Sequence, residues 1–148
     1  MQKTRILAPI IFKFKIMNKN TNLGLLILRI AVGGLMLLHG FAKIGHTSFI
    51  GGMLADKGLP SFLSYGVYIT EIVAPLLILV GFRTRLSAAV YVFGALFALF
   101  LVHTPQLFLI NENGGWELEL LGLYIAGGLT LFFTGGGKIA ISSRNQWD

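Results

Sequence analysis

Residues 23–41 read LGLLILRIAVGGLMLLHGF, a stretch in which Arg29 and His39 are the only ionisable side chains. A helix needs roughly 20 apolar residues to cross about 30 Å of hydrocarbon, and this stretch comes close to that length. Backbone polar groups find no water inside a bilayer, so a spanning segment of this kind must be helical. The stretch therefore predicts a transmembrane helix in a protein whose main solvent is lipid.

Three further apolar segments follow along the chain. They are 65–82, which contains Glu71, then 86–103, and finally about 117–134. Because residues 83–85 alone separate the second segment from the third, the two are predicted to form a tight antiparallel hairpin. The sequence therefore predicts an all-α fold, a transmembrane bundle of four helices that occupies residues 23–142.

The composition agrees with a lipid environment. Charged residues make up 12% of the 148 residues and hydrophobic residues 55%, whereas a soluble domain normally has about a quarter charged residues. The chain has no cysteine, which excludes thiolate metal sites and disulfides within it, and no other metal site is predicted. Any redox chemistry would therefore need a bound cofactor or a partner.

The distribution of basic residues predicts the orientation of the bundle. They cluster at the ends of the apolar segments, without the interleaved aromatics of a nucleic-acid surface, so the net charge of +6 predicts no nucleic-acid partner. One side of the membrane receives only Lys43 and Lys57. The other side receives nine: Lys3, Arg5, Lys13, Lys15, Lys19, Arg83, Arg85, Lys138 and Arg144. Cytoplasmic flanks are enriched in Lys and Arg, so both termini are predicted to lie in the cytoplasm.

The segments outside the four spans carry weaker signals. Residues 42–64 are rich in glycine and predict a short helix at the membrane interface. Residues 143–148 are expected to form a cytoplasmic tail. Residues 1–22 form a cytoplasmic extension whose apolar part, 6–16, is too short to span and lacks a signal-peptide cleavage site. Two interpretations of the extension stay open: an interfacial amphipathic helix, or a translation start at Met17.

Ionisable side chains inside the predicted helices are the main indication of function. At the membrane centre each costs about 2.5–3.5 kcal/mol, so its presence calls for a partner or a role. At about 1.5 Å of rise per residue, the four helices each place at least one such group in a shallow layer near their outer ends. The layer comprises His39 and Lys43 from the first helix, Glu71 from the second, His103 from the third, and Glu117 or Glu119 from the fourth.

Helical geometry predicts which of these side chains face inward. Glu117 and Glu119 are about 200° apart on a helix, so only one can face the bundle centre, and the deeper Glu119 is favoured. Arg29 stands apart, about 9 Å from the cytoplasmic end. It lies within about 80° of His39 and Lys43 around the helix axis, so all three are expected to reach the same interior.

Two interpretations of the polar layer stay open. In the structural one, Glu71 pairs with Lys43 or His39. Arg29 then bonds to backbone carbonyls or reaches the interface, and these contacts only hold helices together. In the functional one, the layer lines a polar pocket that opens outward, because an imidazole beside a carboxylate can exchange protons near neutral pH. The usual role of charges inside a membrane favours the functional interpretation.

Proline and glycine positions predict local features of the helices. Pro75 has no N–H for the carbonyl of Glu71, one turn earlier, which predicts a kink beside the carboxylate. Residues 135–137 are three glycines that predict the end of the fourth helix. Close packing between helices is predicted at Gly33, Gly34, Gly94, Gly122, Gly127 and Gly128.

Several short motifs together resemble a known family. They are LRI at 28–30, HGFAKI at 39–44, EIVAPL at 71–76, GFRTRL at 81–86, EL at 119–120 and TGGGKI at 134–139. The combination is similar to the DoxX family of bacterial membrane proteins over about residues 23–142. One departure is that Gly136 stands where the family often has proline, and Ala140 where it often has serine.

The resemblance implies a four-helix protein of the bacterial inner membrane. Some members are named as subunits of a thiosulfate:quinone oxidoreductase or associate with redox enzymes. The family pattern points to Arg29, His39, Lys43 and Glu71, which the charges within the helices also single out. With the rest of the polar layer, the candidate binding residues are Arg29, His39, Lys43, Glu71, His103 and Glu119.

Three functions are compatible with the sequence. The leading hypothesis is a membrane subunit of a quinone-linked redox system, with no covalent cofactor, in which His39 and Glu71 exchange protons with a quinone head group or a small anionic substrate. Lys43 and Arg29 would supply positive charge. The second is a non-catalytic accessory subunit that anchors a partner, and the third is a small transporter. The expected partners are the lipid bilayer and either a redox enzyme or a second copy of the chain, and the sequence leaves open whether the chain is itself an enzyme.

Overall fold

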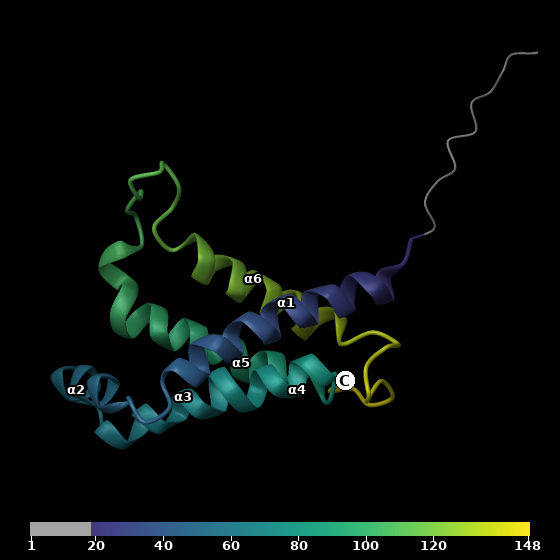
Figure 1. Ribbon diagram of the computed structural model, residues 1–148, viewed down its shortest axis with the longest axis horizontal. Helices are drawn as coiled ribbons and strands as arrows, with labels where there is room; N and C mark the ends of the chain where they lie inside the picture. The colour runs from purple at the N-terminus through teal and green to yellow at the C-terminus, as the bar shows by residue number, and fades with distance from the viewer. Residues whose placement is uncertain (1–18) are drawn as a thin grey trace, which may run out of the picture.

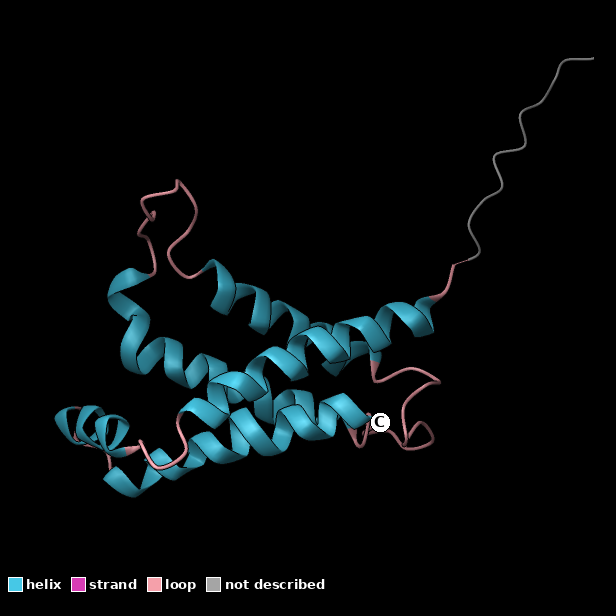
Figure 2. Cartoon of the chain, in the orientation of Figure 1, coloured by secondary structure: helices cyan, strands magenta, loops and turns pink. Residues whose placement is uncertain are grey.

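Helices form nearly all of the regular structure in the computed structural model, which describes residues 19–148 (Figures 1 and 2). Within that range the one strand-like feature is an isolated bridge between Ile110 and Trp116. The predicted all-α fold is therefore confirmed for the described part of the chain. The two interpretations of the N-terminal extension fall in residues 1–18 and lie outside the described residues.

The first predicted span is α1, Thr21–Ala42 (Figure 1). The Asn20 side chain accepts a hydrogen bond from the backbone N–H of Leu23 at 3.1 Å and so caps a free amide of the first turn. At about 1.5 Å per residue, its 22 residues reach about 33 Å, which exceeds the thickness of the hydrocarbon core. Its length and composition therefore confirm a helix able to cross a membrane.

The second long helix, Ser61–Val80, changes its winding along its length. It consists of the 3₁₀ turn η1 (Ser61–Tyr65), α3 (Gly66–Tyr68), η2 (Ile69–Val73) and α4 (Ala74–Val80). The segment η2 is a π-helix, whose backbone winds more widely than an α-helix. Pro75 follows in the first turn of α4 and offers no N–H to the Glu71 carbonyl. The disturbance predicted beside the carboxylate thus takes the form of this wide turn.

The third long helix, Thr84–Gln106, ends in a second wide turn. It consists of α5 (Thr84–Ala98), the π-helical η3 (Leu99–His103) and the 3₁₀ turn η4 (Thr104–Gln106). Between α4 and α5 the chain reverses within three residues. Gly81, with a φ of 76°, and Arg83, with a φ of 46°, adopt the left-handed conformations that such a short turn requires. The short connection predicted at this point is confirmed.

Two shorter helices complete the fold. α2 (Ser48–Asp56) is the short helix predicted in the first connection, and it packs against η1 through the fully buried Leu54. α6 (Glu119–Thr134) is apolar, but its 16 residues reach only about 24 Å. Within the described residues, three helices are thus long and apolar enough to cross a membrane. A fourth span and the orientation of the bundle stay predictions.

The start of α1, the α4–α5 turn and the C-terminal tail meet at one end of the molecule (Figure 1). Lys138 donates its backbone N–H to the Asn22 side chain at 2.9 Å. The tail folds around Asp148, and a hydrogen bond from the Ser142 hydroxyl is the main cause that lowers the pKa of this carboxyl. We call this end the tail end. The opposite end, which carries α2 and the loop 107–118, is called the loop end.

The helices pack through small residues and expose large apolar ones. A Cβ added at Gly127 would lie 2.6 Å from Val32, and one at Gly128 would lie 2.6 Å from Val92, so neither site has room for a side chain. The predicted packing role is wrong for Gly34, where a Cβ would meet nothing within 4 Å because that position is turned off the contact face. The most exposed large apolar side chains of the helices, each 65–70% accessible, are Leu38, Phe62, Phe93, Phe100, Leu123 and Phe133.

Candidate functional site

Arg29 lies near the tail end, apart from the other candidate residues. It is 2% exposed, and its guanidinium donates hydrogen bonds to the carbonyls of Ile78 at 2.8 Å, Leu79 at 2.7 Å and Gly136 at 3.2 Å. Ile78 and Leu79 belong to the last turn of α4, whose carbonyls lack the regular helical partners, and the Ile78 carbonyl also accepts a hydrogen bond from the backbone N–H of Gly81 at 3.1 Å. Arg29 therefore points into the bundle interior and satisfies backbone carbonyls, as the structural interpretation expected, but it lies apart from the residues of the polar layer.

Four other candidate residues line one cavity at the loop end. α1 contributes His39, Lys43 follows α1 directly, η2 contributes Glu71 and η3 contributes His103. The cavity has a volume of about 320 Å³, inside the range of about 300–1,000 Å³ typical of ligand sites. The structure thus brings together the residues that the sequence placed in one layer near the outer ends of the helices.

An ion pair between Lys43 and Glu71 forms part of the cavity wall. Lys43 Nζ donates to Glu71 Oε1, and the two side chains are 29% and 15% exposed. Of the two partners considered for the carboxylate, the lysine makes the contact. Removal of either partner would leave a charge in a largely buried position, which is costly.

Two buried polar atoms of the cavity residues have no hydrogen-bond partner among residues 19–148. They are Glu71 Oε2 and Tyr91 Oη. Tyr91 is only 1% exposed. An unpaired buried polar atom costs about 1–3 kcal/mol, and native proteins pair the great majority of such atoms. Both residues line the cavity, so a hydrogen-bonding group of a ligand that reaches either atom would remove this cost.

Both π-helical turns carry a cavity residue. Glu71 lies inside η2, and His103 is the last residue of η3. Single π-turns alter the direction of the side chains they carry and occur frequently at functional sites. His103 Nδ1 lies 2.6 Å from Gln106 Oε1, and with the amide oxygen facing the ring Nδ1 is the donor of this hydrogen bond. In the neutral ring, Nε2 is consequently left as a proton acceptor.

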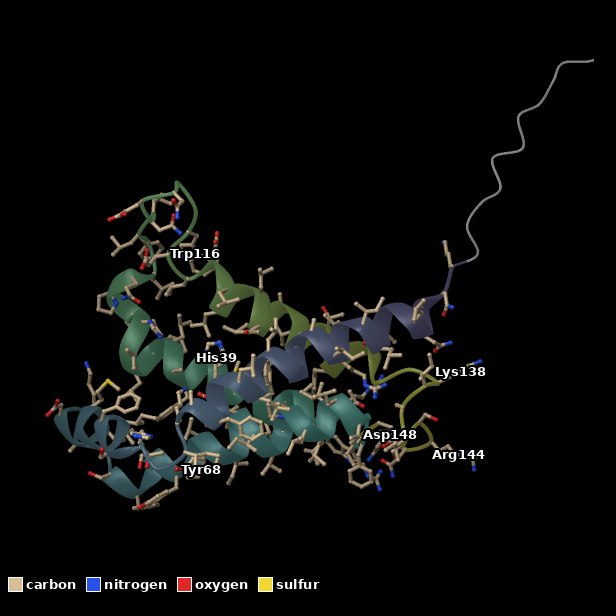
Figure 3. The ribbon with its side chains drawn as sticks, viewed as in Figure 1. His39, Tyr68, Trp116, Lys138, Arg144 and Asp148 are labelled. Atoms are coloured by element: carbon tan, nitrogen blue, oxygen red, sulfur yellow. The ribbon has the colours of Figure 1, made fainter. Side chains whose placement is uncertain are left out.

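Two tyrosines of the cavity were missed by the sequence analysis. Tyr91 and Tyr124 lie within apolar helices, where an aromatic ring is more simply read as core. His39 contacts the Tyr124 ring edge-on, with the ring centroids 5.8 Å apart, and Figure 3 shows His39 on the side of α1 that faces α6. The sequence feature that could have indicated the two tyrosines is that each places a hydroxyl group in a segment with few other polar side chains.

The carboxylate that reaches the cavity near the fourth helix is not the one predicted. Glu117 lines the cavity and Glu119 does not, so the preference for Glu119 is wrong. α6 begins only at Glu119, and residues 117 and 118 precede it, so the helical spacing assumed for the pair does not apply. Glu119 is exposed and lies beside Gly115 of the preceding loop.

The cavity combines groups of both charges with apolar walls. Lysine, two histidines and two carboxylates stand among leucine, alanine and methionine side chains. Among residues 19–148, no three His, Asp or Glu side chains lie close enough to hold a metal ion. The arrangement is able to bind a small ligand through hydrogen bonds and to exchange protons with it.

A model of the DoxX family matches residues 24–104. The chain belongs to the DoxX family. The matched region contains Arg29, His39, Lys43, Glu71 and His103, and it ends before both carboxylates at the start of α6. The family resemblance inferred from short motifs is thereby confirmed.

Relatives of this DoxX protein cover most of its length. It is 28% identical over 114 residues to "Putative oxidoreductase CatD" of Bacillus subtilis, which covers 74% of this chain and 82% of the relative. It is 35% identical over 122 residues to a Haemophilus influenzae protein named "Uncharacterized protein", over 79% and 87% of the two chains. No solved structure matches the chain. Family membership and the three long apolar helices indicate a membrane location.

Proposed function

We propose that this DoxX protein is a membrane subunit of a quinone-linked redox system and that its loop-end cavity binds the quinone head group. The proposed location is the inner membrane of a bacterium, with the loop end outward. The basic residues of the α4–α5 turn and the tail support this orientation, because such residues favour the cytoplasmic side. Family membership and the name of the Bacillus subtilis relative support a role in a redox system.

The observation that carries this proposal is the pair of unpartnered atoms among the cavity residues, Glu71 Oε2 and Tyr91 Oη. A quinone head group presents two carbonyl oxygens on a flat apolar ring. The Tyr91 hydroxyl and the Lys43 ammonium are donors for such oxygens, while Met36 and Leu121 offer apolar surface for the ring. The residues present therefore fit the chemistry of this ligand.

A bound quinone would supply two-electron redox chemistry, with electrons exchanged with a partner redox enzyme. The residues of this chain would handle the accompanying protons. Glu71 would hold a proton at the free Oε2, and His103 would accept one at Nε2. His39 and Glu117 are both exposed and would connect the cavity with the aqueous side.

Substitution of Tyr91→Phe tests the proposal directly. It removes a hydroxyl with no partner among residues 19–148, so the free energy of unfolding should stay unchanged or rise by about 1 kcal/mol. Binding of a short-chain benzoquinone should weaken about tenfold, because one hydrogen bond to the ligand is lost. Titration calorimetry and thermal unfolding in detergent measure the two effects. Tyr65→Phe, on exposed η1, is the matched control and should change neither.

A double variant tests the proton-exchanging groups. Glu71→Gln combined with His39→Ala should abolish the calorimetric signal of the benzoquinone, since a carboxylate and an imidazole of the cavity are lost. Glu112→Gln, in the exposed loop, is the control and should bind as the wild type does. Equal affinity in the wild type and the double variant would overturn the assignment of this cavity.

A further inference from the structure

A second cavity lies directly behind the Lys43–Glu71 pair. Its volume is about 480 Å³, also within the range of about 300–1,000 Å³ typical of ligand sites. It is enclosed by α2, α3 with η2, and α5 with η3. Its lining is more apolar than that of the first cavity, because aromatic and aliphatic side chains make up most of it. The main side chains are Phe49, Ile50, Met53, Val67, Phe97 and Leu101.

The two cavities share one wall. The residues that line both are Lys43, Thr70, Glu71, Gly94, Ala98 and His103. Two of its members, Gly94 and Ala98, have almost no side chain, and Thr70 packs against Gly94 so closely that a Cβ there would collide with it. The polar groups of the wall thus stand at the junction between a polar and an apolar cavity.

The apolar cavity reaches the outer face of the bundle. Phe93 and Phe97, both in its lining, are 67% and 38% exposed. α2 covers the other side, where Phe49, Ile50 and Met53 face the cavity. A hydrocarbon chain can therefore pass from the surrounding lipid into this space without crossing a polar surface.

We propose that the apolar cavity binds the isoprenoid chain of the quinone whose head group occupies the polar cavity. This inference rests on the proposed function. A ligand with its ring against Glu71 and Tyr91 has its ring substituents close to the junction. The apolar cavity is the adjoining space that offers contact to a flexible hydrocarbon chain, and α2 is the element that closes over it.

Variants that fill the apolar cavity test the contribution of the ligand's chain separately from that of its ring. Val67→Phe adds bulk to a side chain that lines only this cavity, as does Leu101→Phe on the opposite wall. Binding of a benzoquinone with a decyl chain should weaken about tenfold, the scale of effect expected when extra atoms are forced into an occupied space. Binding of the same ring without the chain should stay unchanged. Comparison of variants for one ligand cancels the partition of that ligand into detergent or lipid.

The control is Val73→Phe, the same substitution on the same long helix at a side chain that is 48% exposed and lines neither cavity. Thermal unfolding establishes that each variant is folded, and Leu101→Phe carries the test if Val67→Phe does not fold. Loss of affinity for the chain-bearing ligand alone supports the inference. Equal effects on both ligands, or on neither, overturn it and leave the proposed function standing. Failure of the wild type to bind either ligand overturns the proposed function and, with it, this inference.

Discussion

Arg29 shows how a charge can be buried in an apolar bundle without a carboxylate beside it. Its three hydrogen bonds go to main-chain carbonyls, two of them in the last turn of α4. That turn is also the negative end of the helix dipole, so the guanidinium is stabilised electrostatically as well. A single side chain of α1 thereby joins α4 and the tail.

Replacement of Arg29 should therefore destabilise the fold strongly. Arg29→Ala leaves the carbonyls of Leu79 and Gly136 without this donor, each at a cost of about 1–3 kcal/mol, while the Ile78 carbonyl keeps the N–H of Gly81, so we expect a loss of at least about 2 kcal/mol. Arg29→Lys should lose less, since an ammonium keeps the charge but lacks the planar fork of donors. Chemical unfolding in detergent measures both.

Arg144 provides the control for this prediction, because it is exposed and its side chain makes no hydrogen bond among the described residues. Arg144→Ala should change the free energy of unfolding by no more than about 0.5 kcal/mol. A similar effect of the alanine variants at positions 29 and 144 would show that the carbonyl contacts do not stabilise the protein.

At the residue scale, sequence reasoning found the charged part of the site and missed its neutral part. Glu71, Lys43 and His103 stand out because ionisable groups are rare in apolar segments. Tyr91 does not stand out, since its ring is common in cores and only its surroundings show that the hydroxyl is unpaired. Arg29 was grouped with the candidate residues because it shares a side of the first helix with His39 and Lys43, although its depth already set it apart.

At the element scale, α1 and η2 approach each other closely where they cross at Gly40. A Cβ built at Gly40 would lie 2.8 Å from the Glu71 carbonyl carbon and 2.6 Å from Ile72. Backbone cannot move aside as a flexible side chain can. The wide turn of η2 and the glycine of α1 thus fit together and set the position of the carboxylate.

Substitution of this glycine should separate the two elements. Gly40→Ala forces α1 away from η2 and should cost about 3 kcal/mol or more, at the upper end of the usual range for overpacking. The benzoquinone affinity should fall as well, because Glu71 shifts with its backbone. Gly34→Ala is the matched control on the same helix, with open space at the new methyl group. It should stabilise α1 by up to about 1 kcal/mol, since alanine favours helix. Equal stability of the two variants would contradict this contact.

The elements themselves were predictable, and their internal irregularities were not. Length and hydropathy locate α1 and the long helices because a bilayer demands continuous apolar segments. Pro75 predicted an irregularity in the second helix, but no residue pattern distinguishes a π-turn from a kink. Glu119 was misjudged for a similar reason, because a helix start that differs by two residues changes which side chain points inward.

At the scale of the whole molecule, the polar cavity and Arg29 are separated by a dry core. Met36 and Tyr91 belong both to the cavity lining and to the buried cluster, which extends through Val92 and Leu131 to Ile78, an Arg29 contact. The cavity is therefore expected to communicate with one side of the membrane only.

Reconstitution tests this one-sided arrangement. Liposomes that contain the protein and a pH-sensitive dye should leak protons at a rate within about twofold of protein-free liposomes, because the apolar core offers no place for a charge. A protonophore added at the end shows that the dye responds. A leak that increases with protein content and disappears in Glu71→Gln would demonstrate a continuous path and favour the transporter hypothesis.

The polar layer at one end was predictable, whereas the apolar cavity behind it was not. Depth along four helices can be counted from the sequence, so His39, Lys43, Glu71 and His103 could be placed together. The apolar cavity depends on how α2 folds back over η1 and η3. That packing involves residues 42–64, which contain four glycines and no strong periodicity, so the sequence alone does not orient the segment.

The hydrogen bonds of Arg29 also constrain the order of biogenesis. Translation delivers the guanidinium to the membrane 49 residues before the carbonyl of Ile78 and 107 residues before that of Gly136. Until those acceptors emerge from the ribosome, the nascent α1 carries a charge that only water or lipid head groups can solvate. Its insertion depth must then be shallower than in the finished bundle, and the helix settles into place once the last stretch of chain has been made.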